Sequence, residues 1–173
     1  MELTLELLKY TLPALIVFLT AYVMIRGFLK SDEQRRKNEL DKSNQETVLP
    51  LRLQAYERMA LLLERISPES LVMRVNQPGM NARQLHGELL ASIRAEYEHN
   101  LSQQVYISTE AWEKIKIARS NVINLINAAK DQVKEDATSI TLSQKIFEQV
   151  LQLNSPPIQE SLYFLKEEIR ELY

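Results

Sequence analysis

The most constraining feature of this sequence is a run of sixteen residues without a charged side chain, YTLPALIVFLTAYVMI, at positions 10–25. Four more residues, Arg26 to Leu29, extend the segment to twenty residues with one charge. A helix of that length is about 30 Å long, which matches the hydrocarbon core of a bilayer. The sequence therefore predicts a transmembrane helix over residues 10–29, preceded by a short tail over residues 1–9.

The ends of the predicted span carry residues suited to a membrane interface. Aromatic side chains anchor helices at that depth, and Tyr10 and Phe28 lie at opposite ends of the span. Phe18 and Tyr22 are its other two aromatic residues. Arg26 lies close enough to one end for its long side chain to reach the headgroups. This arrangement is typical of a helix that crosses the bilayer once.

The segment has two other possible interpretations. A cleaved signal peptide has a basic leader and a cleavage site of small residues, whereas this leader, MELTLELLK, is acidic and Arg26-Gly27-Phe28 follows the apolar run. The segment also resembles a buried core helix, because sixteen uncharged residues are close to the lower limit for a span.

The distribution of basic residues predicts the direction of the span. Only Lys9 precedes it, whereas the segment that follows is rich in Lys and Arg. Loops with more basic residues stay on the cytoplasmic side. We therefore expect a single-pass protein with its N-terminus outside and its C-terminal domain in the cytoplasm. The basic residues from the end of the span onward are Arg26, Lys30, Arg35, Arg36, Lys37 and Lys42.

Residues 30–47 form a charged connector or stalk with a single large apolar residue, Leu40. The connector is either a solvated continuation of the membrane helix or a flexible tether. Basic side chains beside a membrane attract anionic headgroups, which gives this segment candidate lipid contacts. Interspersed acidic residues also fit a plain solvated linker. The candidate headgroup contacts are Arg26, Lys30, Arg35, Arg36 and Lys37.

The remainder, residues 48–173, is predicted to be an all-α domain. The whole chain has only three glycines, which leaves few sites for the turns that a sheet requires. Apolar residues recur at helical spacing, as in Leu85, Leu89 and Ile93. The expected fold is therefore an N-terminal transmembrane helix followed by a soluble bundle of about four long helices and one short helix.

Breakers and caps divide this domain into its predicted helices. The first starts at Val48 with Pro50 in its first turn and ends at Ser67-Pro68, and a short helix follows over 69–75. The triplet Val105-Tyr106-Ile107 is interpreted as an extended connector. The other predicted helices begin at Asn81, with Gln84 completing a capping box; at Ser108 or Thr109, running to about Glu135; at Thr141, with Gln144 three residues on; and at Ile158.

Charge and cysteine content exclude several classes of function. The net charge is −2 and the domain lacks a basic cluster, so nucleic acid is not an expected partner. There is no cysteine, which rules out disulfides and thiolate metal sites. The glycine-rich phosphate cradles and nucleophile elbows of common enzymes are missing from the sequence. No cofactor is therefore predicted.

Two patterns in the domain suggest chemistry. Glu96 and His99 are three residues apart on one predicted helix, the spacing at which both reach a single metal ion. A carboxylate-bridged metal centre needs a second such pair, and the other histidine, His86, has no glutamate at that spacing. The first half of the domain is also rich in arginine. Internal Arg–Glu networks between helices explain this better than a partner surface does.

The stretch from Leu49 to Ser108 resembles a family of uncharacterised small membrane proteins with a single span, from Bacteroidota. The phrases QAYER, ISP, QPG and EYEHNLSQQVY carry the resemblance. It implies a bacterial inner (cytoplasmic) membrane and carries no assigned activity, so it transfers no functional residues.

The sequence therefore favours a non-enzymatic, membrane-anchored helical module for protein interaction or scaffolding. Its expected partners are the membrane and an unidentified protein or a second copy of itself. One alternative is an accessory subunit of a larger membrane complex, in which the span itself makes contacts. The other is a metal-dependent enzyme that uses Glu96 and His99.

Overall fold

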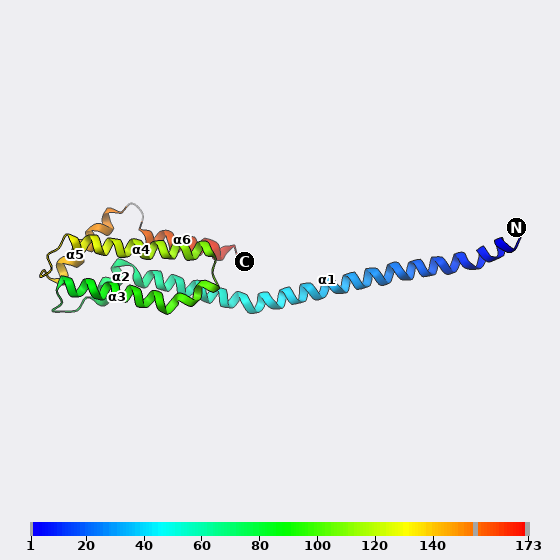
Figure 1. The fold of residues 1–173 in the computed structure, drawn as a ribbon, viewed down its shortest axis with the longest axis horizontal. Helices are drawn as coiled ribbons and strands as arrows, with labels where there is room; N and C mark the ends of the chain where they lie inside the picture. Colours follow the sequence, from blue (N-terminus) through cyan, green and yellow to red (C-terminus); the bar gives the residue numbers. More distant parts are fainter. Residues whose placement is uncertain (1, 154–155, 172–173) are drawn as a thin grey trace. The chain divides into compact units, whose positions relative to one another are not determined.

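The structure, a computed structural model, describes residues 2–153 and 156–171, and the side chains of positions 1–14, 38, 40, 41, 43–45 and 157 lie outside that description. Every element in the described part of the chain is helical (Figure 1), which confirms the all-α prediction. The elements are α1 (Glu2–Ile66), α2 (Pro68–Val75), α3 (Ala82–Asn100), the 3-10 helix η1 (Leu101–Val105), α4 (Thr109–Asp131), α5 (Ser139–Gln152) and α6 (Pro157–Arg170).

Contacts within the chain divide it into two units, Met1–Leu49 and Pro50–Tyr173. In the first unit, α1 continues through residues 30–47, so the connector is helical. Among the residues whose side chains the structure describes, no helical stretch combines the length and apolar character that a membrane crossing needs. The predicted span starts at Tyr10, and its first five side chains lie outside the described residues. The transmembrane helix therefore stays a prediction.

The sequence-based helix start at Val48 is wrong, because Pro50 lies inside α1. Proline usually disrupts a helix interior, since it has no amide hydrogen for the carbonyl four residues earlier. Both Pro50 and Glu46 are exposed, so water can bond to the carbonyl that the proline leaves without a partner. The boundary between the two units falls at this same proline.

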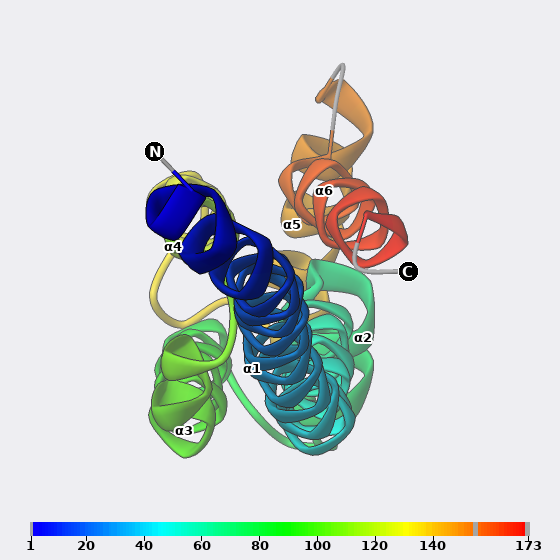
Figure 2. The same cartoon turned by 90° about the vertical axis from the view of Figure 1, so that its right-hand side faces the viewer.

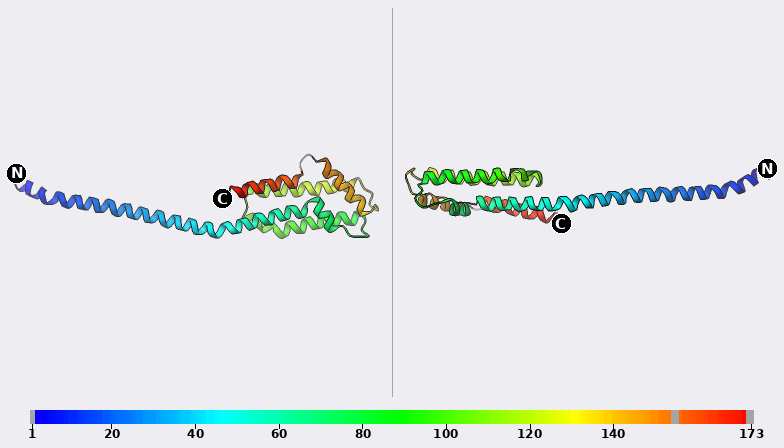
Figure 3. Two further views of the ribbon diagram at one scale, coloured as in Figure 1. Left: turned by 180° about the vertical axis from the view of Figure 1, so that it is seen from behind. Right: turned by 90° about the horizontal axis from the view of Figure 1, so that it is seen from below.

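The second unit is a bundle of four antiparallel arms (Figures 1 and 2). The last turns of α1, continued by α2, form the first arm; α3 and α4 form the next two; and α5 with α6 forms the fourth. Helix α4 packs on both α5 and α6, and α3 packs on α2, α4 and α5. The view from behind shows α6 beside α4 (Figure 3). The described part of this unit has more helices than the predicted four long and one short, because η1 follows α3 and the fourth arm is divided into α5 and α6.

Local capping explains where the helices α2, α3 and α4 begin. The Ser67 side chain accepts a hydrogen bond from the Ser70 amide, and Pro68 occupies the first turn of α2. The predicted capping box is confirmed, since Asn81 and Gln84 each bond the other's backbone amide. Ser108 caps α4 as expected. Each cap satisfies amides that the first helical turn otherwise leaves unpaired.

Two predicted boundaries are wrong. Helix α5 begins at Ser139 with Thr138 as its cap, three residues before the predicted Thr141. An isolated bridge between Asn81 and Thr138 holds this start, because the Ala82 amide donates to the Ala137 carbonyl at 2.8 Å. The triplet 105–107 is not an extended connector either, since Val105 ends the 3-10 helix η1.

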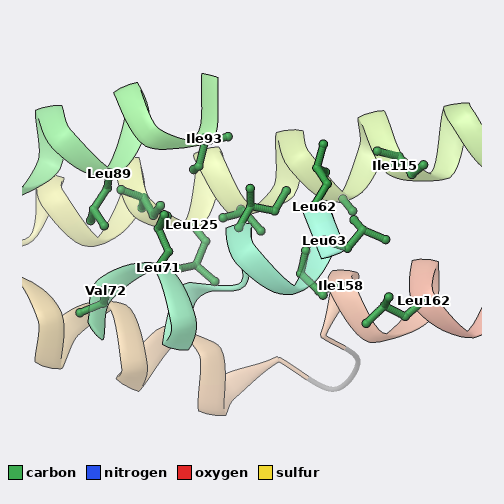
Figure 4. Close-up of a cluster of buried hydrophobic side chains, with 14 of the residues drawn as sticks. Leu62, Leu63, Leu71, Val72, Leu89, Ile93, Ile115, Leu125, Ile158 and Leu162 are labelled. Carbon is green, nitrogen blue, oxygen red and sulfur yellow. The ribbon is translucent and has the colours of Figure 1, made fainter. Parts of the chain in front are cut away.

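The core of the second unit lies between the four arms (Figure 4). The predicted stripe of α3 is buried at Leu85, Leu89 and Ile93. The buried face of α1 in this unit is broad, and it includes Tyr56, Met59, Leu62 and Leu63. A helix in the corner of a bundle faces two neighbours, which widens its apolar face beyond one stripe. The buried residues of α4 and α6 are Ala111, Trp112, Ile115, Ala118, Val122, Leu125, Ile126, Ala129, Ile158, Ser161, Leu162 and Leu165.

Candidate functional site: an arginine-lined cleft

A cleft of the second unit lies between α1 and α3 and has a volume of about 570 Å³. It opens to solvent along the two helices. Arginines from α1 and polar groups from the end of α3 face one another across it. Its lining residues are Arg58, Leu61, Leu62, Arg65, Ala95, Glu96, His99 and Asn100.

Glu96 is the charged centre of this cleft. Its Oε1 accepts a hydrogen bond from Arg65 Nε at 2.6 Å and from Arg74 Nη1 at 2.9 Å. Arg74 also donates through Nη2 to the Arg65 carbonyl at 3.0 Å. The carboxylate thereby joins α1, α2 and α3 at one point. This confirms the interpretation of the arginines as an internal network, for Arg65 and Arg74.

The two arginines set the charge state of Glu96. Burial of the carboxyl raises its pKa, but the hydrogen bonds and positive charges of Arg65 and Arg74 outweigh that effect, so the pKa is lowered overall. The same contact raises the pKa of Arg65. Glu96 is therefore an anion at neutral pH.

A second polar contact closes the end of the cleft. Arg58 Nε donates to Asn100 Oδ1 at 3.3 Å, and Asn100 Nδ2 donates to the Glu96 carbonyl at 2.9 Å. The Asn100 side chain is buried, so these bonds replace the water that it loses. Arg58 is thus positioned by the last turn of α3.

The structure brings Glu96 and His99 to the same cleft, as their spacing suggested. However, the Glu96 carboxylate already accepts hydrogen bonds from the guanidinium groups of Arg65 and Arg74. Among the described residues, no three His, Asp or Glu side chains lie close enough together to hold a metal ion. The other histidine, His86, forms a different contact: its Nε2 lies 2.8 Å from Asn127 Oδ1. This geometry offers no support for the metal-dependent alternative.

Sequence reasoning missed one part of the site, the exposed Leu61. Its side chain is 54% exposed and lies between Arg58 and Arg65 along α1. The signal was present as a spacing of three and then four residues, which places all three on one face of a helix. Arg58 and Arg65 lie on the cleft side of Leu61, whereas the exposed Glu57 and Glu64 lie on its other side. The arginine side suits a partner that carries two carboxylates next to an apolar side chain.

A cluster at Tyr56 ties the first arm to the fourth. The buried Tyr56 hydroxyl accepts a hydrogen bond from the Ser108 amide at 3.4 Å and interacts with the Glu168 carboxylate on α6. Burial and this carboxylate raise the pKa of Tyr56. Arg52 Nε donates to the Tyr106 carbonyl at 3.3 Å on the same side. Tyr56 itself is fully buried, so we interpret the cluster as a contact that stabilises the fold.

A smaller cavity of about 290 Å³ lies where the first and fourth arms are broken. Apolar side chains from α4, α5 and α6, including Leu125, Val150 and Leu162, form most of its wall. Glu64 and Glu69 contribute acidic groups to the same lining. It contains no cluster of groups that suggests a reaction.

The predicted membrane-facing residues belong to the first unit. Tyr10 lies outside the described side chains, and the rings of Phe18 and Tyr22 stack with centroids 6.4 Å apart. The Arg26 guanidinium lies 5.2 Å from the Tyr22 ring centroid, and Phe28 is exposed.

Two of the candidate headgroup contacts form ion pairs along the helix: Arg36 with Asp32 at 3.1 Å and Arg35 with Glu39 at 3.9 Å. Lys30 and Lys37 are exposed. Since exposed ion pairs of this type are weak, these arginines can exchange partners at little cost.

The chain matches a family of unknown function (DUF7935) over residues 2–172 and belongs to that family. The expected membership of an uncharacterised family is therefore confirmed. No curated protein and no solved structure matches the chain.

Proposed function

We propose that this protein is a single-pass membrane-anchored module whose helical bundle binds other proteins. The observation that carries the proposal is the surface of α1 in the first unit. Eleven large apolar side chains within residues 15–29 are between 46% and 74% exposed. They are Leu15, Ile16, Val17, Phe18, Leu19, Tyr22, Val23, Met24, Ile25, Phe28 and Leu29.

Energetics favour a bilayer as the cover for this surface. Removing one large apolar side chain from water is worth roughly 1.5–3 kcal/mol. The free energy gained by removing all eleven side chains from water therefore exceeds the roughly 5–15 kcal/mol by which an ordinary domain is stable. The Thr20 hydroxyl donates to the Ile16 and Val17 carbonyls, which satisfies this polar group inside hydrocarbon.

The charged connector supports an orientation with the bundle in the cytoplasm. Basic residues cluster directly after the apolar segment and favour retention on that side. The helical form of residues 30–47 places these charges along one stalk. A bacterial inner membrane is the proposed setting. The arginine-lined cleft is the proposed contact surface for a protein partner.

Membrane anchoring is tested by extraction of cell membranes at alkaline pH. The full chain is expected to remain in the pellet, whereas the double variant Val17→Arg/Val23→Arg is expected to be released, because an arginine near the middle of a span costs about 2.5–3.5 kcal/mol. The matched control is Met73→Arg/Ile140→Arg, at exposed apolar positions of the bundle. Release of the unaltered chain would refute the anchor.

Orientation is tested by labelling single cysteines, which is direct because the chain has none of its own. Glu2→Cys is expected to react with a membrane-impermeant maleimide in intact cells, and Glu69→Cys only after the cells are opened. The reverse pattern would overturn the proposed topology.

Partner binding is tested by cross-linking in cells followed by affinity purification and mass spectrometry. Exchange of residues 10–29 for an unrelated span provides the comparison. Partners retained after the exchange bind through the bundle, whereas loss of every partner would assign the contacts to the span and favour an accessory subunit of a membrane complex.

A further inference from the structure

We propose that the arginine face of α1 in one copy binds the exposed face of α6 in a second copy of this chain. This inference rests on the proposed role of the bundle as a binding module and names its partner. We define the arginine face as Arg58, Leu61 and Arg65, and the acidic face as Glu160, Tyr163 and Glu167.

The arginine face presents two positive charges next to an apolar group. Arg65 is 52% exposed despite its contact with Glu96, and Leu61 is 54% exposed. Arg58 is half-buried beside Asn100. The three positions follow one another at spacings of three and four residues and therefore share one side of α1. A complementary surface needs two carboxylates next to an apolar or aromatic group.

The acidic face meets this requirement with the same spacing. Glu160, Tyr163 and Glu167 are separated by three and then four residues of α6. Tyr163 is 66% exposed, and it forms no hydrogen bond or ring contact with any residue in the described part of the chain. An aromatic side chain in this position is a common anchor of protein interfaces.

The ion pairs that already involve the acidic face do not prevent docking. Glu160 lies 3.8 Å from Lys114, with the carboxylate side chain 64% exposed. Glu167 contacts Arg170 one turn away, and that arginine is itself largely exposed. Exposed pairs of this kind contribute little to stability, so the carboxylates can turn to the arginines of another copy.

The two faces match in length and in charge when the helices run antiparallel. Seven residues of helix span about 10.5 Å, so the two arginines and the two glutamates are equally far apart along their axes. Antiparallel packing sets the arginine side of Leu61 against the glutamate side of Tyr163, with Leu61 and Tyr163 offset by one residue, about 1.5 Å, when the charges are level. Long Arg and Glu side chains absorb that offset. Each copy carries both faces, so a second copy is a complete partner, and a shared membrane raises its effective concentration.

Cross-linking between introduced cysteines tests the contact in the full-length protein. A chain with Leu61→Cys is produced together with a differently tagged chain carrying Tyr163→Cys, and isolated membranes are treated with a mild oxidant. A disulfide requires Cα atoms about 4.4–6.8 Å apart, so it reports direct contact. We expect at least ten times more mixed dimer than from the control pair Met73→Cys and Tyr163→Cys, since Met73 is exposed but lies on neither face. A yield no greater than the control would overturn the proposal.

Charge reversal provides the second test. The first change is Glu160→Arg/Glu167→Arg on the chain that carries Tyr163→Cys, and it is expected to abolish the mixed dimer. The second change is Arg58→Glu/Arg65→Glu on the chain that carries Leu61→Cys, and it is expected to restore the mixed dimer. The first change leaves the cleft and its Glu96 contacts intact, so it remains decisive even where the arginine variant fails to fold. Persistence of the dimer after the first change would refute the charge pairing.

The outcome is distinguishable from failure of the membrane anchor. If the chain is recovered in the soluble fraction, the anchor is refuted, and the same cysteine pairs are then oxidised in that fraction. If the chain is anchored but the mixed dimer is absent, the anchor stands and a different protein occupies the arginine face.

Discussion

Replacement of Glu96 by glutamine tests whether its carboxylate holds the first three helices of the bundle together. Glutamine keeps the shape of the side chain but removes its negative charge. Arg65 and Arg74 then face a neutral amide that cannot replace the charge-assisted hydrogen bonds.

The expected loss of stability is about 2 kcal/mol. Hydrogen bonds to charged groups contribute about 1.5–3 kcal/mol when buried, and Glu96 is only 16% exposed. Both arginines remain accessible to water and can be rehydrated in the variant. The loss of stability is therefore well below the combined value of two buried hydrogen bonds. For a domain of this size the melting temperature should fall by about 6–8 °C.

Circular dichroism of the full-length chain in detergent measures this change. The matched control is Glu113→Gln, which removes an exposed partner of Lys116 within one helix and should cost less than about 0.5 kcal/mol. If Glu96→Gln lowers the melting temperature no more than Glu113→Gln does, the carboxylate does not hold the helices as described.

The pH dependence supplies an independent check on the same carboxylate. The pKa of Glu96 is lowered in the folded state, so the unfolded chain binds its proton more readily. Its contribution is fully present above the unfolded pKa of about 4.3 and is lost as pH falls through the lower folded value. The difference between the unaltered chain and Glu96→Gln should therefore shrink below about pH 4. A difference that stays constant into that range would contradict the assigned charge pairing.

Three further substitutions probe the bundle. Leu89→Ala removes a fully buried side chain and should cost about 2–5 kcal/mol in a denaturant titration. Asn81→Ala removes the capping box of α3 and should cost about 1 kcal/mol in the same assay, with little change in helix content. Tyr56→Phe should weaken the loss of stability above about pH 10, because the raised pKa of Tyr56 makes the folded state hold that proton more tightly. A thermal-unfolding series between pH 8 and pH 11 measures the last effect.

Much of the bundle follows from short-range signals. Asn81 with Gln84, Ser108, and Ser67 with Pro68 each act within four residues, so the starts of α2, α3 and α4 are readable from the sequence. The stripe of α3 at Leu85, Leu89 and Ile93 is readable for the same reason, because one helical face recurs every three or four residues.

A helix boundary that depends on contacts with distant residues cannot be predicted from the local sequence. The start of α5 at Ser139 depends on backbone bonds to residues 80–82, more than fifty positions earlier. There the local preference for a start at Thr141 is overruled by bonds whose partners the sequence does not identify. Pro50 differs, because α1 continues through it where the Glu46 carbonyl is open to water.

The sequence by itself determined the helical class, most of the caps, and the charge-free segment on which the proposed anchor rests. It also showed that Glu96 and His99 share a helix face, because that relation lies within one turn. Only the tertiary structure decided that Arg65 and Arg74 converge on Glu96, at separations of 31 and 22 residues. Ion pairs between helices depend on which helix faces pack together. The burial of apolar side chains selects those faces, and the charged side chains then pair with whatever lies opposite.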